Sequence, residues 1–393
     1  MQFVSESVKN LPPYLFAELE KKKRALQEQG VDVIDLGIGA PDLPTPSFIV
    51  EELASAARAP LNHRYSSYQG CKEFREAVAL FYQRHYGVSL DPDTEVLTLI
   101  GSKEGIAHLL QAVVNPGETV ITPNPGYPVY RSAIHLVGAK AADLPLDADD
   151  NYAPAFSKVS KSVKDAAKAM LLNYPANPTA ATVELNTFMK AIAFAKENEL
   201  LLINDMAYDL ITFGDYTAPS ILQVPGAKEW AIEFGSLSKS FNMTGWRIGF
   251  AVGNKKAVRS LATLKSNVDS SQFLPVQLAA AKALRSDLSA TREHAEIFRT
   301  RMEKMHAGLH KLGIRANKPK GTIFLWIRVP AAYTSSAFAE KLLEEAGIII
   351  TPGTAFGSAG EGYARIALTV SSERLDEVLE RLMQLDLKGG NKT

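Results

Sequence analysis

The sequence predicts an α/β fold with a large domain, in which helices sandwich a mostly parallel sheet of the seven-stranded type, and a smaller α+β domain. From about residue 46, helical patterns alternate with short, continuous apolar runs bounded by turn residues. Such runs are typical of parallel strands that are buried on both faces. After about residue 285, a long charged helix and fewer strands indicate the smaller domain. We therefore assign residues 46–285 to the large domain, and residues 1–45 and 286–393 to an N-terminal arm plus the smaller domain.

The composition is that of a globular protein with a sizeable core. Of 393 residues, 46% are apolar and 22% are charged. Basic and acidic residues both number 43, and this balance does not favour binding to nucleic acid or to an anionic membrane. Cys71 is the single cysteine, which excludes an internal disulfide, and the seven histidines show no metal-ligand spacing. Because the N-terminus has no targeting pattern and no apolar run has membrane-spanning length, we expect a cytoplasmic protein.

The elements follow in order along the chain. After Pro12-Pro13, residues 14–30 predict an amphipathic helix ended by Gly30, and residues 33–46 predict a short strand and a Gly/Pro loop. Helices are predicted at 46–58 and 72–87. Six apolar runs predict the strands of the large domain: 95–100, 119–123, 169–175, 201–206, 231–238 and 248–254. The smaller domain is predicted to contain helices at 289–313, 335–347 and 372–385, and strands at 321–330, 348–353 and 363–370.

Unusual residues follow several predicted strands, where open α/β sheets bind ligands. Gly101-Ser102-Lys103 follows the first long strand and should open a helix, whose free N–H groups suit a phosphate. Many strand–helix turns contain Gly-Ser, so this signal alone is weak. Asp205 ends a buried strand, where a carboxylate is costly unless it meets a cation or donors. It is either a helix cap or turn acid, or a carboxylate that keeps a ring nitrogen protonated.

The segment "SLSKSFNMTGWRIGF", residues 236–250, holds one lysine among serines. A lysine near a cation or in a poorly hydrated pocket has a lowered pKa and can act as a nucleophile. Arg247, eight positions after Lys239, offers a planar fork suited to a phosphate. Taken alone, Lys239 also fits a solvated loop residue.

Together these segments resemble the class I, pyridoxal-phosphate-dependent aminotransferases of fold type I. The resemblance extends from about Leu36 to about Thr369. Its motifs agree in spacing: Asn177 to Asp205 is 28 positions, Asp205 to Tyr208 three, Ser236 to Lys239 three and Lys239 to Arg247 eight. It implies that residues 46–285 bind pyridoxal 5′-phosphate.

The resemblance also implies a role for each matching residue. Lys239 would carry the cofactor covalently and move the proton at the substrate α-carbon, and Asp205 would pair with the ring nitrogen. Asn177 and Tyr208 would bind the phenolate oxygen of the ring, and Tyr127 would stack on its face. The phosphate would be held by Ser102, Lys103, Ser236 and Arg247.

Further matches concern the substrate and a second subunit. Arg365, in "YARIALT", would bind the substrate α-carboxylate as a fork, with Gly39 and Asn177 close to it. Tyr65 would reach the phosphate of a neighbouring subunit, which implies a homodimer with shared active sites. The chain departs from the family at Ala180, where glycine is usual after Asn-Pro-Thr, so the turn after Asn177 is expected to differ.

Substrate choice rests on finer resemblance alone. Segments such as "NLPPYLFAELEKKK", "LIGSKEGIAHLL" and "ITPGTAFG" look like the bacterial LL-diaminopimelate aminotransferases of lysine biosynthesis, which take the amino group from glutamate. Aminotransferases for aspartate, alanine or N-acetyl-diaminopimelate share much of this pattern. A C–S β-lyase of the same fold would use the same residues. A transcription regulator with this domain is disfavoured, because only about 30 residues precede the first motif.

Overall fold

The computed structural model describes residues 3–11 and 15–387. Pro12 and Pro13, after which the sequence predicts the first helix, lie outside the described residues. None of the described helices is both long and apolar enough to cross a membrane.

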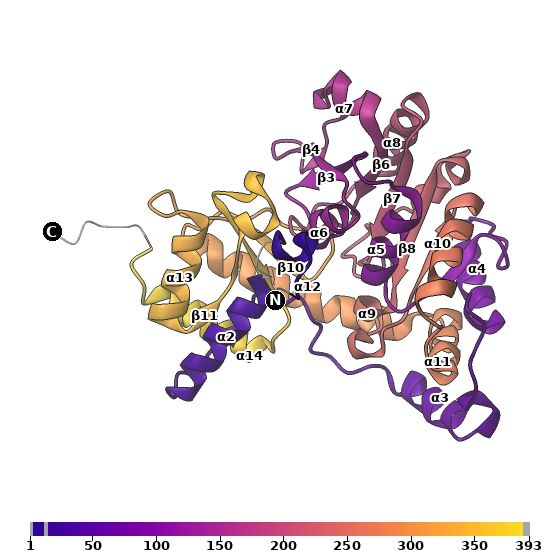
Figure 1. The fold of residues 1–393 in the computed structure, drawn as a ribbon. Helices are drawn as coiled ribbons and strands as arrows, with labels where there is room; N and C mark the ends of the chain where they lie inside the picture. Colours follow the sequence, from indigo (N-terminus) through magenta and orange to yellow (C-terminus); the bar gives the residue numbers. More distant parts are fainter. Residues whose placement is uncertain (1–2, 12–14, 388–393) are drawn as a thin grey trace.

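An eight-stranded sheet forms the centre of the larger part of the molecule, on the right in Figure 1. Its strands lie in the order β2-β9-β8-β7-β6-β3-β4-β5. Strands β4, β3, β6, β7 and β8 pair in parallel, whereas β9 is antiparallel to both of its neighbours. The bounds are β2 Val96–Leu99, β3 Thr119–Asn124, β4 Lys140–Asp147, β5 Ala153–Pro154, β6 Ala167–Leu172, β7 Leu201–Met206, β8 Ala231–Ser236 and β9 Gly249–Gly253.

Strands β4 and β5 were not predicted from the sequence and add to the six predicted strands of the large domain. The segment "KAADLPLD" of β4 mixes Ala, Asp and Pro, and Leu144 is its one buried residue among those whose side chains are described. It lies near the edge of the sheet, so it needs no continuous apolar run. The sheet therefore has eight strands, one more than the predicted type, and is mostly parallel as predicted.

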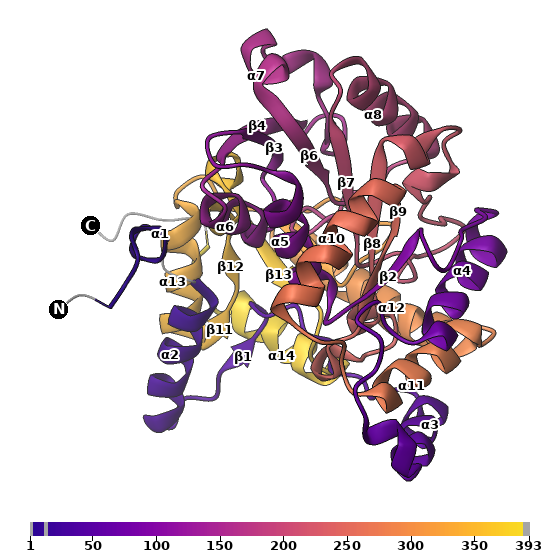
Figure 2. The ribbon, with the colours of Figure 1, turned by 45° about the vertical axis from the view of Figure 1, so that its right-hand side comes forward.

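Alternating residues along each strand face two helical layers. On β6, Met170 and Leu172 pack in one core with α3, α4, α8 and α11, whereas Ala169 and Leu171 pack in another core with α5, α6 and α10. Figure 2 shows α5, α6 and α10 in front of the sheet. The helices of this part are α3 Ser47–Ala57, α4 Lys72–Tyr86, α5 Ser102–Val113, α6 Pro128–Leu136, α7 Lys161–Ala166, α8 Leu185–Glu197, α9 Leu237–Ser240, α10 Lys255–Val268 and α11 Leu274–Arg285.

The smaller part combines segments from both ends of the chain. Strand β1 (Ile34–Asp35) pairs in parallel with β11 (Ile348–Ile349), and β10, β13 and β12 form a three-stranded antiparallel sheet. The long helix α12 packs against these strands in a third core. The remaining bounds are α1 Glu6–Lys9, α2 Leu15–Glu28, α12 Ser289–Lys311, β10 Phe324–Arg328, α13 Ser335–Ala346, β12 Thr351–Pro352, β13 Tyr363–Ala367 and α14 Ser372–Met383. The N-terminal segment thus lies beside residues more than 300 positions later.

Candidate active site

A cavity of about 300 Å³ opens beyond the C-terminal ends of β6, β7 and β8. This is the position that open α/β sheets use for ligands, and the volume suits a small molecule. The predicted site residues that line the cavity are Gly39, Ser102, Lys103, Tyr127, Asn177, Asp205, Tyr208, Ser236, Lys239, Arg247 and Arg365. Only Tyr65, among the predicted residues, lies elsewhere.

Lys239 extends into the cavity from the short helix α9. The hydroxyl of Ser236 accepts a hydrogen bond from the Ser238 N–H at 3.2 Å, which begins the helix one turn before the lysine. Lys239 Nζ donates to the Gly39 carbonyl at 2.6 Å. Burial, together with the charges of Arg365 and Arg247, lowers the pKa of Lys239 to about 8. A larger share of neutral amine near neutral pH makes this lysine a usable nucleophile.

Asp205 lies at the end of β7 and is buried. Its Oδ2 accepts from the Tyr130 hydroxyl at 2.8 Å, while Oδ1 has no hydrogen-bond partner among the described residues. Burial raises the pKa of Asp205 to about 6. A buried oxygen without a donor costs about 1–3 kcal/mol, so this carboxylate is suited to a ligand that brings an N–H group.

The other end of the cavity is built for an anion. Helix α5 begins at Ser102, and its N-cap residue, Gly101, has no side chain that could cap the first N–H groups. Gly101 precedes it with φ +94°, and a Cβ built there would lie 2.3 Å from Arg247 Nη2. Arg247 Nη1 donates to the Thr244 carbonyl at 2.8 Å, which orients the guanidinium. Free N–H groups at a helix start and a neighbouring guanidinium together attract a phosphate.

Arg365 is buried in β13 on the opposite side of the cavity. Its Nη1 donates to Asn177 Oδ1 at 2.8 Å and its Nη2 to the Gly37 carbonyl at 2.5 Å. The guanidinium carbon lies 4.3 Å from the ring centre of Phe324 and 4.8 Å from that of Phe356. These contacts hold a permanent positive charge in a fixed orientation.

Two predicted tyrosines contribute rings to the cavity wall. Tyr208 is buried and meets Phe324 edge-to-face at 5.5 Å, and burial raises the pKa of its hydroxyl well above the usual value. Its hydroxyl therefore remains a hydrogen-bond donor throughout the physiological pH range. Tyr127 meets Tyr130 edge-to-face at 5.5 Å.

Tyr65 lies outside this cavity, in the segment between residues 63 and 72, and is 93% exposed. The structure of one chain therefore does not bring Tyr65 together with the other predicted residues.

Ala180 adopts the left-handed conformation that glycine would favour, with φ +55°. Its N–H donates to the Ala176 carbonyl at 3.0 Å, which closes the turn. The sequence predicts a changed turn after Asn177. A positive φ costs roughly 1–2 kcal/mol for a residue with a Cβ, and the difference from the family's turn stays a prediction.

Several residues that line or support the cavity were not predicted from the sequence. They include Tyr130, Asn173, Ser238, Thr244 and Phe324. Tyr130 had a detectable signal, since it is three positions after Tyr127 and so lies on the same face of α6. Asn173 had no such signal in the sequence, because its role depends on contacts within the fold. Its Nδ2 donates to the Asp205 carbonyl and its Oδ1 accepts from the Asn177 N–H, both at 2.7 Å.

Comparison with known proteins agrees with this geometry. Residues 31–382 match the family described as aminotransferase class I and II. The chain is 50% identical to the LL-diaminopimelate aminotransferase of Aquifex aeolicus, over 98% of this chain and 99% of that protein. It is 48% identical to the enzyme of the same name from Moorella thermoacetica, over 96% and 97%. A solved structure, apo-BacF from Bacillus subtilis, superposes with TM-score 0.96 at 39% identity and full coverage of both chains.

The cofactor of this family, pyridoxal phosphate, combines an aldehyde, a ring nitrogen and a phosphate. The cavity offers a group suited to each: the amine of Lys239, the unpartnered Oδ1 of Asp205, and the start of α5 beside Arg247. The residues present therefore fit the cofactor. The chain belongs to the class I and II aminotransferases and is a pyridoxal-phosphate-dependent transaminase.

Proposed function

We propose that this enzyme moves an amino group between glutamate and LL-diaminopimelate, the compound for which its relatives are named, in lysine biosynthesis. The observation that carries the proposal is the 46–50% identity over nearly the whole chain to several proteins of that name. Bound in the cavity, pyridoxal phosphate supplies an electron-withdrawing ring that stabilises negative charge at the substrate α-carbon.

Lys239 is proposed to be the catalytic amine and the residue that carries the cofactor. Its lowered pKa supports this role, because the neutral amine is needed both to attack a carbonyl and to accept a proton. The contact with the Gly39 carbonyl holds Nζ on the side of the cavity where Arg365 lies. From there Lys239 moves the proton at the substrate α-carbon.

Asp205 is proposed to bind the ring nitrogen and keep it protonated. The oxygen that lacks a donor supports this assignment, as does the Tyr130 hydrogen bond that fixes the other oxygen. A nearby positive charge would lower the raised pKa of Asp205 and keep the carboxylate ionised. Asn177 and Tyr208 would then donate to the phenolate oxygen, and Tyr127 would cover one face of the ring.

Arg365 is proposed to bind the α-carboxylate of the substrate. The side chain is held by Asn177, Gly37 and two aromatic rings, so little freedom is lost when the carboxylate binds. Gly39 lies against Phe324, where a Cβ would come within 2.6 Å of the ring, and leaves room for that carboxylate.

Ser102, Lys103, Ser236 and Arg247 are proposed to hold the phosphate, together with the first N–H groups of α5. The support is a positive cluster at a helix start that also lines the cavity. Both Lys103 and Arg247 are exposed in one chain, so this end of the cavity is open to solvent.

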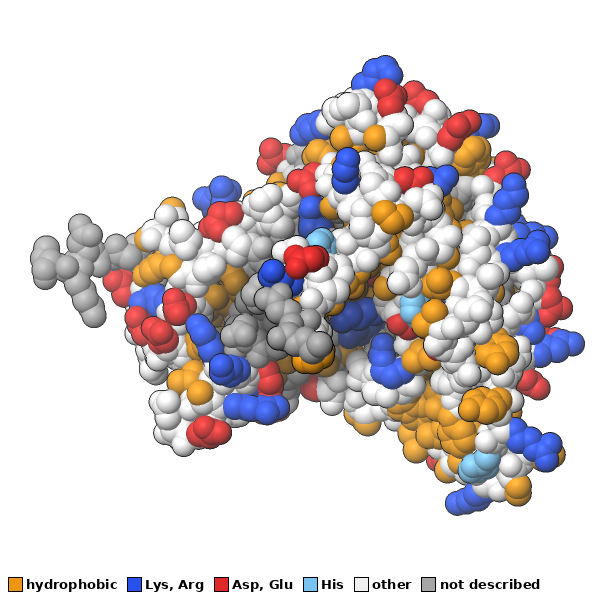
Figure 3. Space-filling view, in the orientation of Figure 1, with side chains coloured by type: hydrophobic (Ala, Val, Ile, Leu, Met, Phe, Trp, Pro, Cys, Tyr) orange, Lys and Arg blue, Asp and Glu red, His pale blue; other side chains and the backbone are white. Residues whose placement is uncertain are grey.

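A homodimer is proposed to close that open end, with Tyr65 of each chain reaching the phosphate of the other. Apolar side chains gather at the lower right of Figure 3, over α3 and α11. Leu61, Tyr65, Tyr68 and Phe273 are all exposed, and the rings of His63 and Phe273 lie 5.3 Å apart. Exposed apolar groups that gather on one face favour a protein partner.

The proposed substrate pair is tested by a half-reaction screen. The purified enzyme, loaded with pyridoxal phosphate, is mixed with single amino acids, and the change in cofactor absorbance is followed. Fast conversion by both glutamate and LL-diaminopimelate is expected. Conversion by aspartate or alanine but not by LL-diaminopimelate would contradict the substrate, although not the transaminase chemistry. Release of pyruvate and ammonia without an oxo acid would favour a C–S β-lyase.

A further inference from the structure

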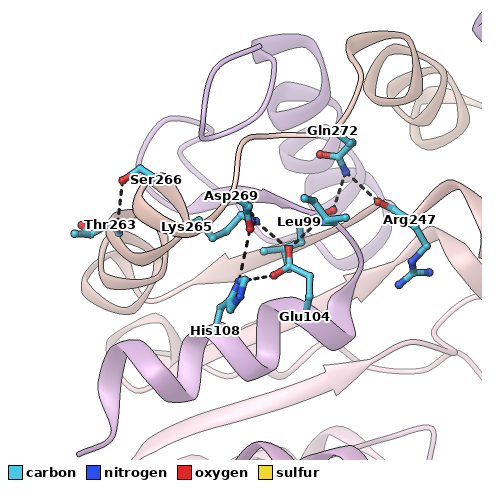
Figure 4. A network of polar contacts seen from close by, with 10 residues as sticks. Leu99, Glu104, His108, Arg247, Thr263, Lys265, Ser266, Asp269 and Gln272 are labelled. Carbon is cyan, nitrogen blue, oxygen red and sulfur yellow. Dashed lines mark hydrogen bonds and ion pairs between the residues drawn. The ribbon is translucent and has the colours of Figure 1, made fainter. Parts of the chain in front are cut away.

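Four ionisable side chains from two helices meet behind the anion end of the cavity (Figure 4). Glu104 and His108 come from α5, and Lys265 and Asp269 from α10 and its C-terminal cap. Lys265 is only 1% exposed, and its Nζ donates to Glu104 Oε1 at 2.9 Å and to both Asp269 oxygens at 3.0 Å. A lysine buried to this degree must have a stabilising partner, and here it has two.

The cluster does not require a metal ion. One ligand atom from each of Glu104, His108 and Asp269 lies within 4.8 Å of the others, a grouping that a divalent cation could use. The Lys265 ammonium, however, already lies within hydrogen-bond distance of both carboxylates. His108 Nδ1 lies 2.7 Å from Glu104 Oε2, and neither atom has a hydrogen-bond partner among the described residues. The positive charge at this place is therefore supplied by the chain itself.

The cluster is connected to the anion end through the backbone. Glu104 Oε1, which accepts from Lys265, also accepts from the Ile100 N–H at 2.8 Å. Ile100 immediately precedes Gly101, the residue packed against the Arg247 guanidinium. Gln272 Nε2 donates to the Leu99 carbonyl at 2.8 Å and to the Arg247 carbonyl at 3.2 Å. Figure 4 shows this glutamine between the end of β2 and Arg247.

The charge of Glu104 matters because of where it lies. It is in the first turn of α5, the turn whose N–H groups would face a phosphate. A carboxylate there competes for the positive end of the helix dipole and repels a second anion. The buried ammonium of Lys265 offsets this negative charge from the side away from the cavity.

We propose that Lys265 is a positioning residue for the cofactor phosphate. It pairs with Glu104, which also accepts from the Ile100 N–H and so holds the Leu99–Ser102 turn, while Gln272 ties that turn to Arg247. The inference rests on the proposed phosphate site at Ser102, Lys103 and Arg247, and adds residues that never touch the cofactor.

The test compares two ligands on the cofactor-free enzyme: pyridoxal phosphate and pyridoxal, which lacks the phosphate. Lys265→Met should weaken pyridoxal phosphate binding at least tenfold and change pyridoxal binding by less than about twofold, measured by fluorescence titration. Glu104→Gln added to Lys265→Met should restore most of the loss, because glutamine still accepts from the Ile100 N–H but carries no charge. Lys161→Met is the matched control, since Lys161 also pairs with an aspartate four positions later but is exposed.

Each alternative outcome has its own meaning. Unchanged pyridoxal phosphate binding in Lys265→Met, or equal weakening of both ligands, overturns the proposal. If Lys265→Met does not fold, the proposal is tested with Gln272→Leu and with the double variant that combines Lys265→Met and Glu104→Gln. The double variant should bind pyridoxal phosphate nearly as well as the parent enzyme, and Gln272→Leu should lose affinity for that ligand alone. Arg247→Met separates the premise from the inference, because an unchanged affinity for pyridoxal phosphate in that variant would refute the phosphate site itself.

Discussion

At the residue scale, the pKa values of Asp205 and Lys239 are shifted toward each other, and burial is the main cause of both shifts. Burial disfavours charge, so it raises the pKa of the carboxyl to about 6 and lowers that of the amine to about 8. Each group is thereby brought closer to neutral pH, where catalytic groups are most effective. The sequence could indicate these two residues from their motifs. It could not indicate the hydrogen bond from Tyr130 to Asp205, because that contact between α6 and β7 depends on how the strands are ordered in the sheet.

The raised pKa of Asp205 makes a prediction about stability in the cofactor-free enzyme. An acid whose pKa is higher in the folded than in the unfolded state holds its proton more tightly when folded. Stability is then lost as pH rises from about 4 to about 6 and remains lower above that range. In Asp205→Asn, the free energy of unfolding should fall by about 2–3 kcal/mol less between these pH values than in the unsubstituted enzyme. Urea unfolding at pH 4 and at pH 7.5 measures it, and equal pH dependence in both proteins would contradict the assigned environment.

Arg365→Lys should reduce kcat/KM by the equivalent of about 2–5 kcal/mol. Lysine cannot make the fork that Arg365 makes with Asn177 and Gly37, and it lacks the planar group that lies between Phe324 and Phe356. Arg328→Lys, an exposed site on the neighbouring strand, is the matched control and should leave kcat/KM unchanged. An unaltered kcat/KM in Arg365→Lys would remove this arginine from substrate binding.

At the element scale, the turn between β2 and α5 determines the geometry of the proposed phosphate site. Its glycine could be predicted from the sequence, because a strand followed by Gly-Ser suggests a tight entry into a helix. The approach of Arg247 to Gly101 could not, since these residues are 146 positions apart and meet only because β2 pairs with β9. The same limit applies to β4, whose mixed composition conceals a strand near the edge of the sheet.

Gly101→Ala should weaken pyridoxal phosphate binding more than tenfold. The added Cβ would meet Arg247 Nη2 at 2.3 Å, in a backbone conformation (φ +94°) that already disfavours a side chain. Gly117→Ala is the control, because its φ is +86° but nothing lies within 4 Å of its Cβ. Both variants should lose stability, and only Gly101→Ala should lose cofactor affinity. Equal cofactor affinity in the two variants would contradict the close approach of Arg247.

At the scale of the whole molecule, the cavity depends on segments from the entire chain. Gly39 comes from the N-terminal segment, Lys239 from the middle and Arg365 from the C-terminal part. The sequence predicts this assembly only through the family resemblance. No local sequence pattern indicates that β1 lies beside β11. The domain boundaries after residues 45 and 285, like the cytoplasmic location, stay predictions.

The proposed dimer predicts a solution mass of twice 42.7 kDa. Tyr65→Phe should leave that mass unchanged but weaken pyridoxal phosphate binding severalfold, because the lost hydroxyl would belong to the partner's phosphate site. Analytical ultracentrifugation and cofactor titration measure the two quantities. A monomeric mass, or unchanged cofactor affinity in Tyr65→Phe, would contradict a shared site.

The most direct measurement is reduction of the cofactor-loaded enzyme with borohydride, followed by digestion and mass spectrometry. Borohydride makes a lysine–cofactor link permanent, so the label should appear on the peptide that contains Lys239 and should be absent in Lys239→Arg. A label on another lysine, or no label after pyridoxal phosphate has been supplied, would contradict the account.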